Sequence, residues 1–123
     1  MAKILIVEDE QYLRELYEQL LSDAGHTIDT AANGQEGWEK ASAGGYDLVL
    51  LDIIMPKLDG MAILKRLKQT PPSIPNKKIV MLTVLREDHY IQEALTQGAD
   101  GYLMKPSFTP DQIVTEVEKI LKT

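Results

Sequence analysis

The chain has 123 residues with 19 acidic and 13 basic side chains, which gives a net charge of −6. This length suits one domain with a single core, residues 1–123, and the acidic balance opposes nonspecific binding to nucleic acid. The lack of cysteine excludes disulfides, thiolate metal sites and thiol catalysis.

The amino terminus carries an apolar run of only four residues, Ile4 to Val7. A secretory signal needs an apolar region of about 7–15 residues, and a membrane helix needs about 20. We therefore expect no membrane insertion and a cytoplasmic location.

The first buried strand is predicted over Lys3 to Val7, and it ends at Glu8-Asp9-Glu10. A helix should follow and stop at Gly25. Thr27 to Ala32 is predicted to be a second strand, and its more polar composition favours the edge of a sheet. The helix between them shows an apolar face at helical spacing, formed by Leu13, Leu16, Tyr17, Leu20, Leu21 and Ala24.

The middle of the chain predicts a helix, a strand and a second helix. Asn33 can cap the first helix, which ends at Gly44-Gly45. Leu48 to Leu51 reads as a buried strand that delivers Asp52 to its carboxyl end. Asp59 can cap the second helix, and a proline-rich loop follows at Thr70 to Asn76. The inward residues should be Trp38 and Ala41 in the first helix and Ile63, Leu64 and Leu67 in the second.

The last part of the chain repeats this alternation. Lys78 to Leu82 is predicted to be a strand ending at Thr83, and Gly101 to Met104 a strand ending at Lys105-Pro106. A helix from about Glu87 to Gly98 separates them, and Thr109 to Gln112 resembles a capping box for a last helix. The inner faces should contain Ile91, Ala94 and Leu95 in the first helix and Ile113, Val117, Ile120 and Leu121 in the last.

Five strands alternating with five helices predict an α/β fold with a doubly wound parallel sheet. Right-handed crossovers then place helices on both faces. An edge position for the second strand fits the flavodoxin-like order 2-1-3-4-5, in which the switch point lies between strands one and three. Ligands of such sheets bind at that point, outside the carboxyl ends of the strands.

Polar side chains follow four of the five predicted strands. Glu8 and Asp9 follow the first, Asp52 the third, Thr83 the fourth and Lys105 the fifth. Three carboxylates at one place repel each other unless a hard cation lies among them, and oxygen ligands favour Mg²⁺. A hydroxyl and an ammonium opposite the carboxylates suit a phosphoryl group. An aspartate between metal and lysine can then accept that group as an aspartyl phosphate.

These residues stand in a pattern that resembles the receiver domain of two-component response regulators. The motifs are Glu8-Asp9 after an apolar strand, Asp52-x-x-Met55-Pro56-x-x-Asp59-Gly60, Thr83, and Gly98-Ala99-Asp100-Gly101-Tyr102-Leu103-x-Lys105-Pro106. Each motif is weak by itself, whereas together they cover essentially the whole chain in the right order and spacing.

The resemblance implies a role for each matching residue. Asp52 would accept the phosphoryl group from a partner's phosphohistidine, on a sensor histidine kinase or a histidine phosphotransfer protein. Asp9, Asp52 and the Ile54 carbonyl would bind Mg²⁺, and Glu8 would act through water. Thr83 and Lys105 would hold the phosphoryl group, so the chain would catalyse only its own phosphorylation and dephosphorylation.

The resemblance also implies a switch and an output surface. Tyr102 would change rotamer together with Thr83, and the fourth helix, fifth strand and fifth helix would present a surface to a downstream protein target. Lys105-Pro106 would be a cis peptide that aims the lysine over the pocket. No effector domain follows in this sequence, which suits a stand-alone regulator similar to those of chemotaxis or a receiver cut from a longer protein.

Several positions depart from the family pattern. Val84 is bulky where the family has a small residue, which predicts crowded access to the phosphoryl site. The resemblance implies that the side chains two residues after Asp52 and two after Thr83 flank the path of an attacking water. Here they are the apolar Ile54 and Leu85, which predicts a long-lived phosphoryl group. The last helix lacks the arginine-rich pattern of receivers from winged-helix transcription factors, so a dimer of that type is not expected.

Two other functions use the same kinds of residue. Haloacid-dehalogenase-like phosphatases have an aspartate nucleophile, a Thr or Ser and a lysine, but they carry a second acid where this chain has Ile54. A degenerate receiver would act only as a binding module and would lack one of the acids, Thr83 or Lys105. Asp52 could also be an ordinary solvated aspartate at a strand end.

Overall fold

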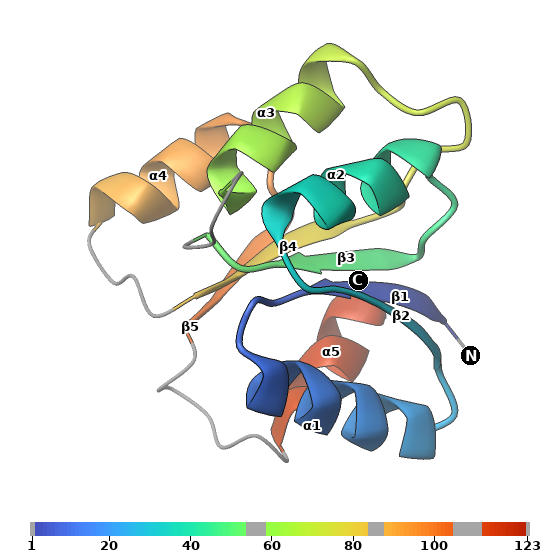
Figure 1. Ribbon diagram of the computed structural model, residues 1–123. Coiled ribbons are helices and arrows are strands. Elements are labelled where there is room, and N and C mark those ends of the chain that lie inside the picture. Colours follow the sequence, from blue (N-terminus) through green and yellow to red (C-terminus); the bar gives the residue numbers. More distant parts are fainter. Residues whose placement is uncertain (1, 54–58, 84–87, 105–111, 123) are drawn as a thin grey trace.

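The computed structural model describes residues 2–53, 59–83, 88–104 and 112–122. Five parallel strands form one sheet in the order β2-β1-β3-β4-β5, which confirms the predicted topology (Figure 1). The strands are β1 (Lys3–Val7), β2 (Thr27–Ala31), β3 (Leu48–Leu51), β4 (Ile79–Thr83) and β5 (Gly101–Met104). The helices are α1 (Gln11–Asp23), α2 (Gly34–Ala43), α3 (Gly60–Gln69), α4 (Asp88–Thr96) and α5 (Ile113–Leu121).

Helices cover both faces of the sheet, so its central strands are apolar on both sides. In Figure 1, α1 and α5 lie on one face, and α2, α3 and α4 lie on the other. The core on the first face includes Ile4, Tyr17, Leu21, Leu50, Leu82 and Val117. The core on the second face includes Leu5, Val49, Leu51, Ile63, Leu64, Met81 and Ala94. Every residue of β3 is fully buried, as its continuous apolar run predicts.

Side-chain caps start two of the helices where the sequence predicts them. Asn33 Oδ1 accepts a hydrogen bond of 2.9 Å from the backbone N–H of Glu36 at the start of α2. Asp59 Oδ1 accepts one of 2.8 Å from the N–H of Ala62 at the start of α3. Each cap satisfies one of the N–H groups that lack a partner within the helix. The capping box predicted for the last helix lies mostly outside the described residues.

Two side chains predicted to be buried are exposed. Leu95 is 46% exposed, because α4 packs beside the edge strand β5 and buries a narrow stripe that contains Ala94. Ala24 is exposed because α1 ends at Asp23 and leaves Ala24 as its C-terminal cap residue. No helix within the described ranges is both long enough and apolar enough to cross a bilayer.

The outer edge of β2 carries a polar network. Asp29 pairs with Lys40 at 2.9 Å and accepts a hydrogen bond of 2.8 Å from the Tyr46 hydroxyl. Burial disfavours the Asp29 carboxylate, but the hydrogen bonds from Lys40 and Tyr46 outweigh it and lower the pKa of Asp29 below its usual 3.8. Burial, together with the neighbouring Asp29 carboxylate, raises the pKa of Tyr46. Lys40 also donates to the Thr30 carbonyl, so this network occupies backbone groups of the edge strand.

Candidate functional site

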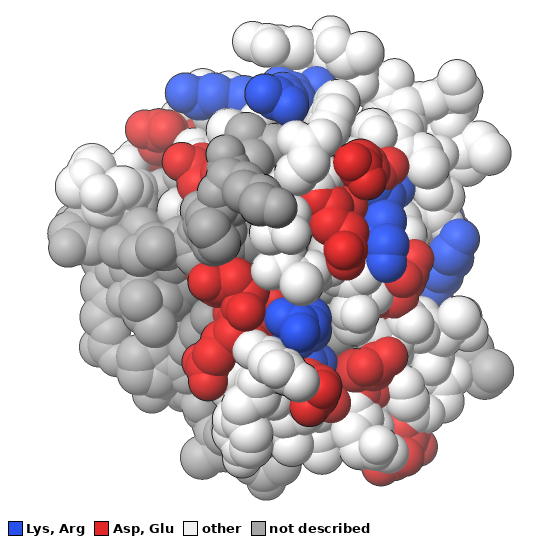
Figure 2. Space-filling model, in the orientation of Figure 1, with Lys and Arg blue, Asp and Glu red and all other residues white. Residues whose placement is uncertain are grey.

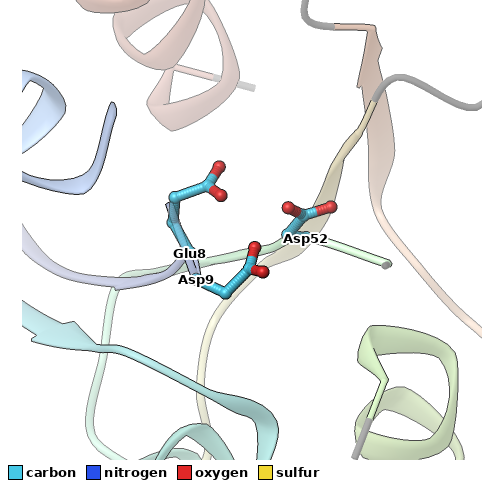
Figure 3. A group of neighbouring side chains, drawn as sticks. All are labelled: Glu8, Asp9 and Asp52. Carbon is cyan, nitrogen blue, oxygen red and sulfur yellow. The ribbon is translucent and has the colours of Figure 1, made fainter. Parts of the chain in front are cut away.

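The carboxyl ends of β1 and β3 bring three carboxylates together. Val7 lies opposite Leu51 in the parallel register, so the two strands end side by side. The Asp52 backbone N–H also donates to the Val7 carbonyl at 3.0 Å. Glu8 and Asp9 follow β1 and Asp52 follows β3, and their carboxylates point toward a common space (Figure 3).

The three carboxylates are close enough to bind one cation. Each offers an oxygen that lies within 4.8 Å of those of the other two. Glu8 is 1% exposed and Asp52 is 5% exposed, whereas Asp9 is exposed to solvent. Buried carboxylates at this spacing repel each other strongly, and a cation among them offsets the repulsion. An oxygen-only donor set of this kind fits Mg²⁺, which takes one or two carboxylates and keeps several waters.

Glu8 differs from the two aspartates because its side chain also holds the backbone. Its Oε2 accepts a hydrogen bond of 3.1 Å from the N–H of Glu10, at the start of α1. The Glu8 N–H donates in turn to the Ala31 carbonyl at 3.1 Å, which ties the β1–α1 loop to the end of β2. The buried Glu8 therefore shapes this loop as well as adding negative charge to the site.

Among the described residues, acidic side chains outnumber basic ones around the site (Figure 2). Figure 2 shows acidic side chains gathered over the start of α1 and the start of α2, with basic side chains between them. Such a field attracts cations and repels free anions. The charge of the described residues therefore favours a cation at the cluster of Glu8, Asp9 and Asp52.

The structure describes some of the other predicted site residues in part. Thr83 ends β4 and pairs in register with Met104, the last residue of β5, while its side chain lies outside what is described. Tyr102 is partly buried and packs against the core on the α2, α3 and α4 face. The remaining predicted positions fall outside the described residues, and they are Ile54, Val84, Leu85, Lys105 and Pro106, including the cis peptide predicted at Lys105-Pro106.

Two residues near the site had no predicted role there. Gly60 begins α3 directly against Asp52, and a Cβ atom at Gly60 would lie 2.1 Å from the Asp52 carbonyl oxygen. Only glycine allows that approach, and the Gly60 N–H donates to the Ile53 carbonyl at 3.0 Å. The other is Arg14, whose Nη1 donates to the backbone carbonyls of Glu8 and Asp9. Its sequence signal is a basic residue in the first part of a helix, where positive charge is disfavoured.

Comparison with known proteins places this arrangement in context. Residues 4–118 match the family model described as the response regulator receiver domain. The transcriptional regulatory protein DltR of Streptococcus agalactiae is 37% identical over 115 residues, which cover 94% of this chain and 50% of that protein. The transcriptional regulatory protein SrrA of Staphylococcus aureus is 37% identical over 123 residues, covering 98% and 48%. The chain thus spans about half the length of the curated relatives it matches.

Solved structures show the same fold. The Francisella response regulator 1452 receiver domain is 27% identical, with a TM-score of 0.86 and coverage of 99% of this chain and 98% of that one. A CheY-like receiver domain protein from Methanospirillum hungatei is 28% identical, with a TM-score of 0.85 and coverage of 99% and 94%. The Vibrio cholerae chemotaxis protein CheY4 is 32% identical, with a TM-score of 0.82 and coverage of 98% of both chains.

Proposed function

The chain belongs to the response regulator receiver domain family, and from this premise we propose that Asp52 is its phosphoryl acceptor in a Mg²⁺-dependent reaction. A receiver domain is a phosphoryl-accepting module of two-component signalling, and it takes its phosphoryl group from a partner. The family match sets aside the haloacid-dehalogenase-like phosphatase. The degenerate receiver remains as the alternative that the experiment below tests.

The observation that carries the proposal is the grouping of Glu8, Asp9 and Asp52. Their oxygens lie within 4.8 Å of one another, and the Glu8 and Asp52 side chains are almost completely buried. Mg²⁺ at this position would neutralise negative charge on the phosphoryl oxygens. Asp9 and Asp52 are the direct ligands in this proposal, together with the Ile54 carbonyl, and Glu8 acts through a bound water.

The proposed reaction is a transfer from one nucleophile to another. An Asp52 carboxylate oxygen attacks phosphorus, a P–O bond forms, and the P–N bond to the partner's phosphohistidine breaks. The imidazole leaves with the bonding electron pair and takes up a proton. Thr83 hydrogen-bonds one phosphoryl oxygen and Lys105 offers its ammonium to another, so the chain contributes positioning and charge neutralisation.

The phosphoryl donor in this proposal is a sensor histidine kinase or a histidine phosphotransfer protein. The output is a change on the surface of α4, β5 and α5, which a downstream protein recognises. Tyr102 supports this role because it lies in β5 beside β4, the strand that ends at Thr83, and its side chain is only partly buried. The phosphoryl group would draw Thr83 inward and let Tyr102 follow, which shifts an existing equilibrium between two states.

Incubation with acetyl phosphate tests the proposal by intact-mass spectrometry. The wild type should gain the mass of one phosphoryl group with Mg²⁺ and none with EDTA, and Asp52→Asn should gain none. Asp59→Asn is a matched control, because it makes the same change at a helix cap outside the cluster and should behave as the wild type. An equal gain in EDTA, or no gain by the wild type with Mg²⁺, would show a degenerate receiver or a different chemistry.

A further inference from the structure

Arg14 occupies an unfavourable position for a basic residue. It lies at the end of the first turn of α1, a helix that has no acidic residue in that turn and no side-chain cap at Glu10. The helix dipole disfavours positive charge in the first turn. A compensating interaction is therefore expected. The side chains of a helix lean toward its N-terminus, and the acidic loop of Glu8, Asp9 and Glu10 lies at that end of α1.

The Arg14 guanidinium reaches back and binds that loop. Nη1 donates to the Glu8 carbonyl oxygen at 3.0 Å and to the Asp9 carbonyl oxygen at 3.4 Å. The Arg14 backbone N–H also donates to the Glu10 carbonyl at 3.0 Å. One residue of α1 thus contacts the carbonyl groups of all three acidic residues that follow β1.

We propose that Arg14 is a positioning residue for the metal site. By fixing the carbonyls of Glu8 and Asp9, it holds the Asp9 carboxylate in the same space as the Asp52 carboxylate. Asp9 needs such support because it is exposed and leaves from a loop, whereas Asp52 is buried and directly follows a strand. The inference rests on the proposed function, because it concerns the Mg²⁺ that the carboxylates would hold.

The charge of Arg14 and its hydrogen bonds act on Mg²⁺ in opposite directions. A guanidinium near the carboxylates repels a cation, so loss of its charge alone would tighten Mg²⁺ binding. Loss of its two hydrogen bonds frees the loop and weakens binding, and losing such a support commonly weakens metal affinity about 10- to 100-fold. The sign of the change therefore separates positioning from simple electrostatics.

Isothermal titration with Mg²⁺ alone provides the test. Arg14→Met should bind Mg²⁺ at least about 10-fold more weakly than the wild type. Arg14→Lys keeps the charge but loses the planar fork, and its affinity should lie between the two. Arg66→Met is a matched control. Arg66 lies in α3 and its guanidinium sits over the ring of Trp38 in α2, so its loss should leave Mg²⁺ binding unchanged. Arg14→Met binding Mg²⁺ as tightly as the wild type, or more tightly, would overturn the proposal.

Phosphorylation kinetics provide a second test of the role of Arg14. With acetyl phosphate, Arg14→Met should need more Mg²⁺ for half-maximal rate and should approach the wild-type rate at saturating Mg²⁺. A lowered limiting rate with unchanged Mg²⁺ dependence would contradict positioning of the metal ligands. If circular dichroism shows that Arg14→Met does not fold, the Mg²⁺ affinity of Arg14→Lys provides the test instead. An effect of charge alone predicts an unchanged affinity for Arg14→Lys, whereas a positioning role predicts a weaker one.

The outcomes also separate this inference from the proposed function. A wild type that binds Mg²⁺ but takes up no phosphoryl group refutes the function and leaves the Arg14 titration valid. A wild type that is phosphorylated with Mg²⁺, but whose Mg²⁺ affinity does not depend on Arg14, refutes only the inference. A wild type that binds no Mg²⁺ overturns both.

Discussion

Removing one charge from the acidic cluster should stabilise the protein when no metal is present. In Asp9→Asn the side chain keeps its size and loses its charge, so its repulsion with Glu8 and Asp52 disappears. At 4.8 Å, the upper limit of the separations between these carboxylate oxygens, two unit charges interact by about 3.5 kcal/mol at an effective dielectric constant of about 20 and by about 0.9 kcal/mol in bulk water. Because Asp9 is exposed, the lower value is closer. We therefore expect a gain of about 1–2 kcal/mol from the two repulsions together.

Mg²⁺ should reduce or reverse the stability that Asp9→Asn gains over the wild type. A ligand at ten times its dissociation constant stabilises the folded wild type by about 1.4 kcal/mol. Asp9→Asn lacks one of the proposed metal ligands, so Mg²⁺ should stabilise it less than the wild type. Urea unfolding in EDTA and in Mg²⁺ measures both effects, and the single tryptophan, Trp38, packs against the core and reports unfolding.

Asp59→Asn is the control for this comparison. It removes the same charge at the exposed cap of α3, where asparagine caps as well as aspartate. Its unfolding free energy should stay the same or fall by a few tenths of a kcal/mol, because a negative charge favours a helix N-terminus. If Asp9→Asn is no more stable than the wild type in EDTA, or if Asp59→Asn gains equally, local repulsion is not the cause.

Three further predictions follow from individual residues. In Gly60→Ala the new Cβ would displace the Asp52 carbonyl. This variant should therefore lose about 1–3 kcal/mol of unfolding free energy in urea titrations and take up the phosphoryl group more slowly. A variant as stable as the wild type and phosphorylated at the same rate would contradict this. The pKa of Asp29 is lower in the folded protein, so the unfolded chain binds this proton first as the pH falls. The difference in unfolding free energy between the wild type and Asp29→Asn should therefore shrink as the pH falls below 3.8. A difference that does not depend on pH would refute this linkage. The double variant Ile54→Asn with Leu85→Glu should lose its phosphoryl group about ten-fold faster in single-turnover dephosphorylation. An unchanged rate would show that these two side chains do not control the attack of water.

The sheet was predictable because its strands are short, continuous apolar runs. All five strands lie within one residue of the predicted ranges. The polar composition of the second strand fits the edge position that β2 has in the observed order 2-1-3-4-5. Periodicity was less informative for α4. Helical spacing alone assigned Leu95 to the core, but a helix beside an edge strand buries a narrower stripe, and Leu95 is exposed.

The acidic cluster was predictable because parallel strands bring their carboxyl ends to one edge of the sheet. That rule places Glu8, Asp9 and Asp52 together without any knowledge of side-chain contacts. The supporting residues were not predictable in the same way. The contact of Gly60 with the Asp52 carbonyl and the reach of Arg14 to the loop depend on the path of the backbone between elements, which strand and helix patterns leave open.

Locating the phosphoryl group tests the central claim most directly. The protein is incubated with acetyl phosphate and Mg²⁺, digested, and mapped by tandem mass spectrometry for an acid-stable, base-labile adduct. We predict the adduct on Asp52, with none on Glu8 or Asp9 and none anywhere in Asp52→Asn. An adduct on another residue of the wild type, or one that persists in Asp52→Asn, would contradict the assignment of Asp52 as the phosphoryl acceptor.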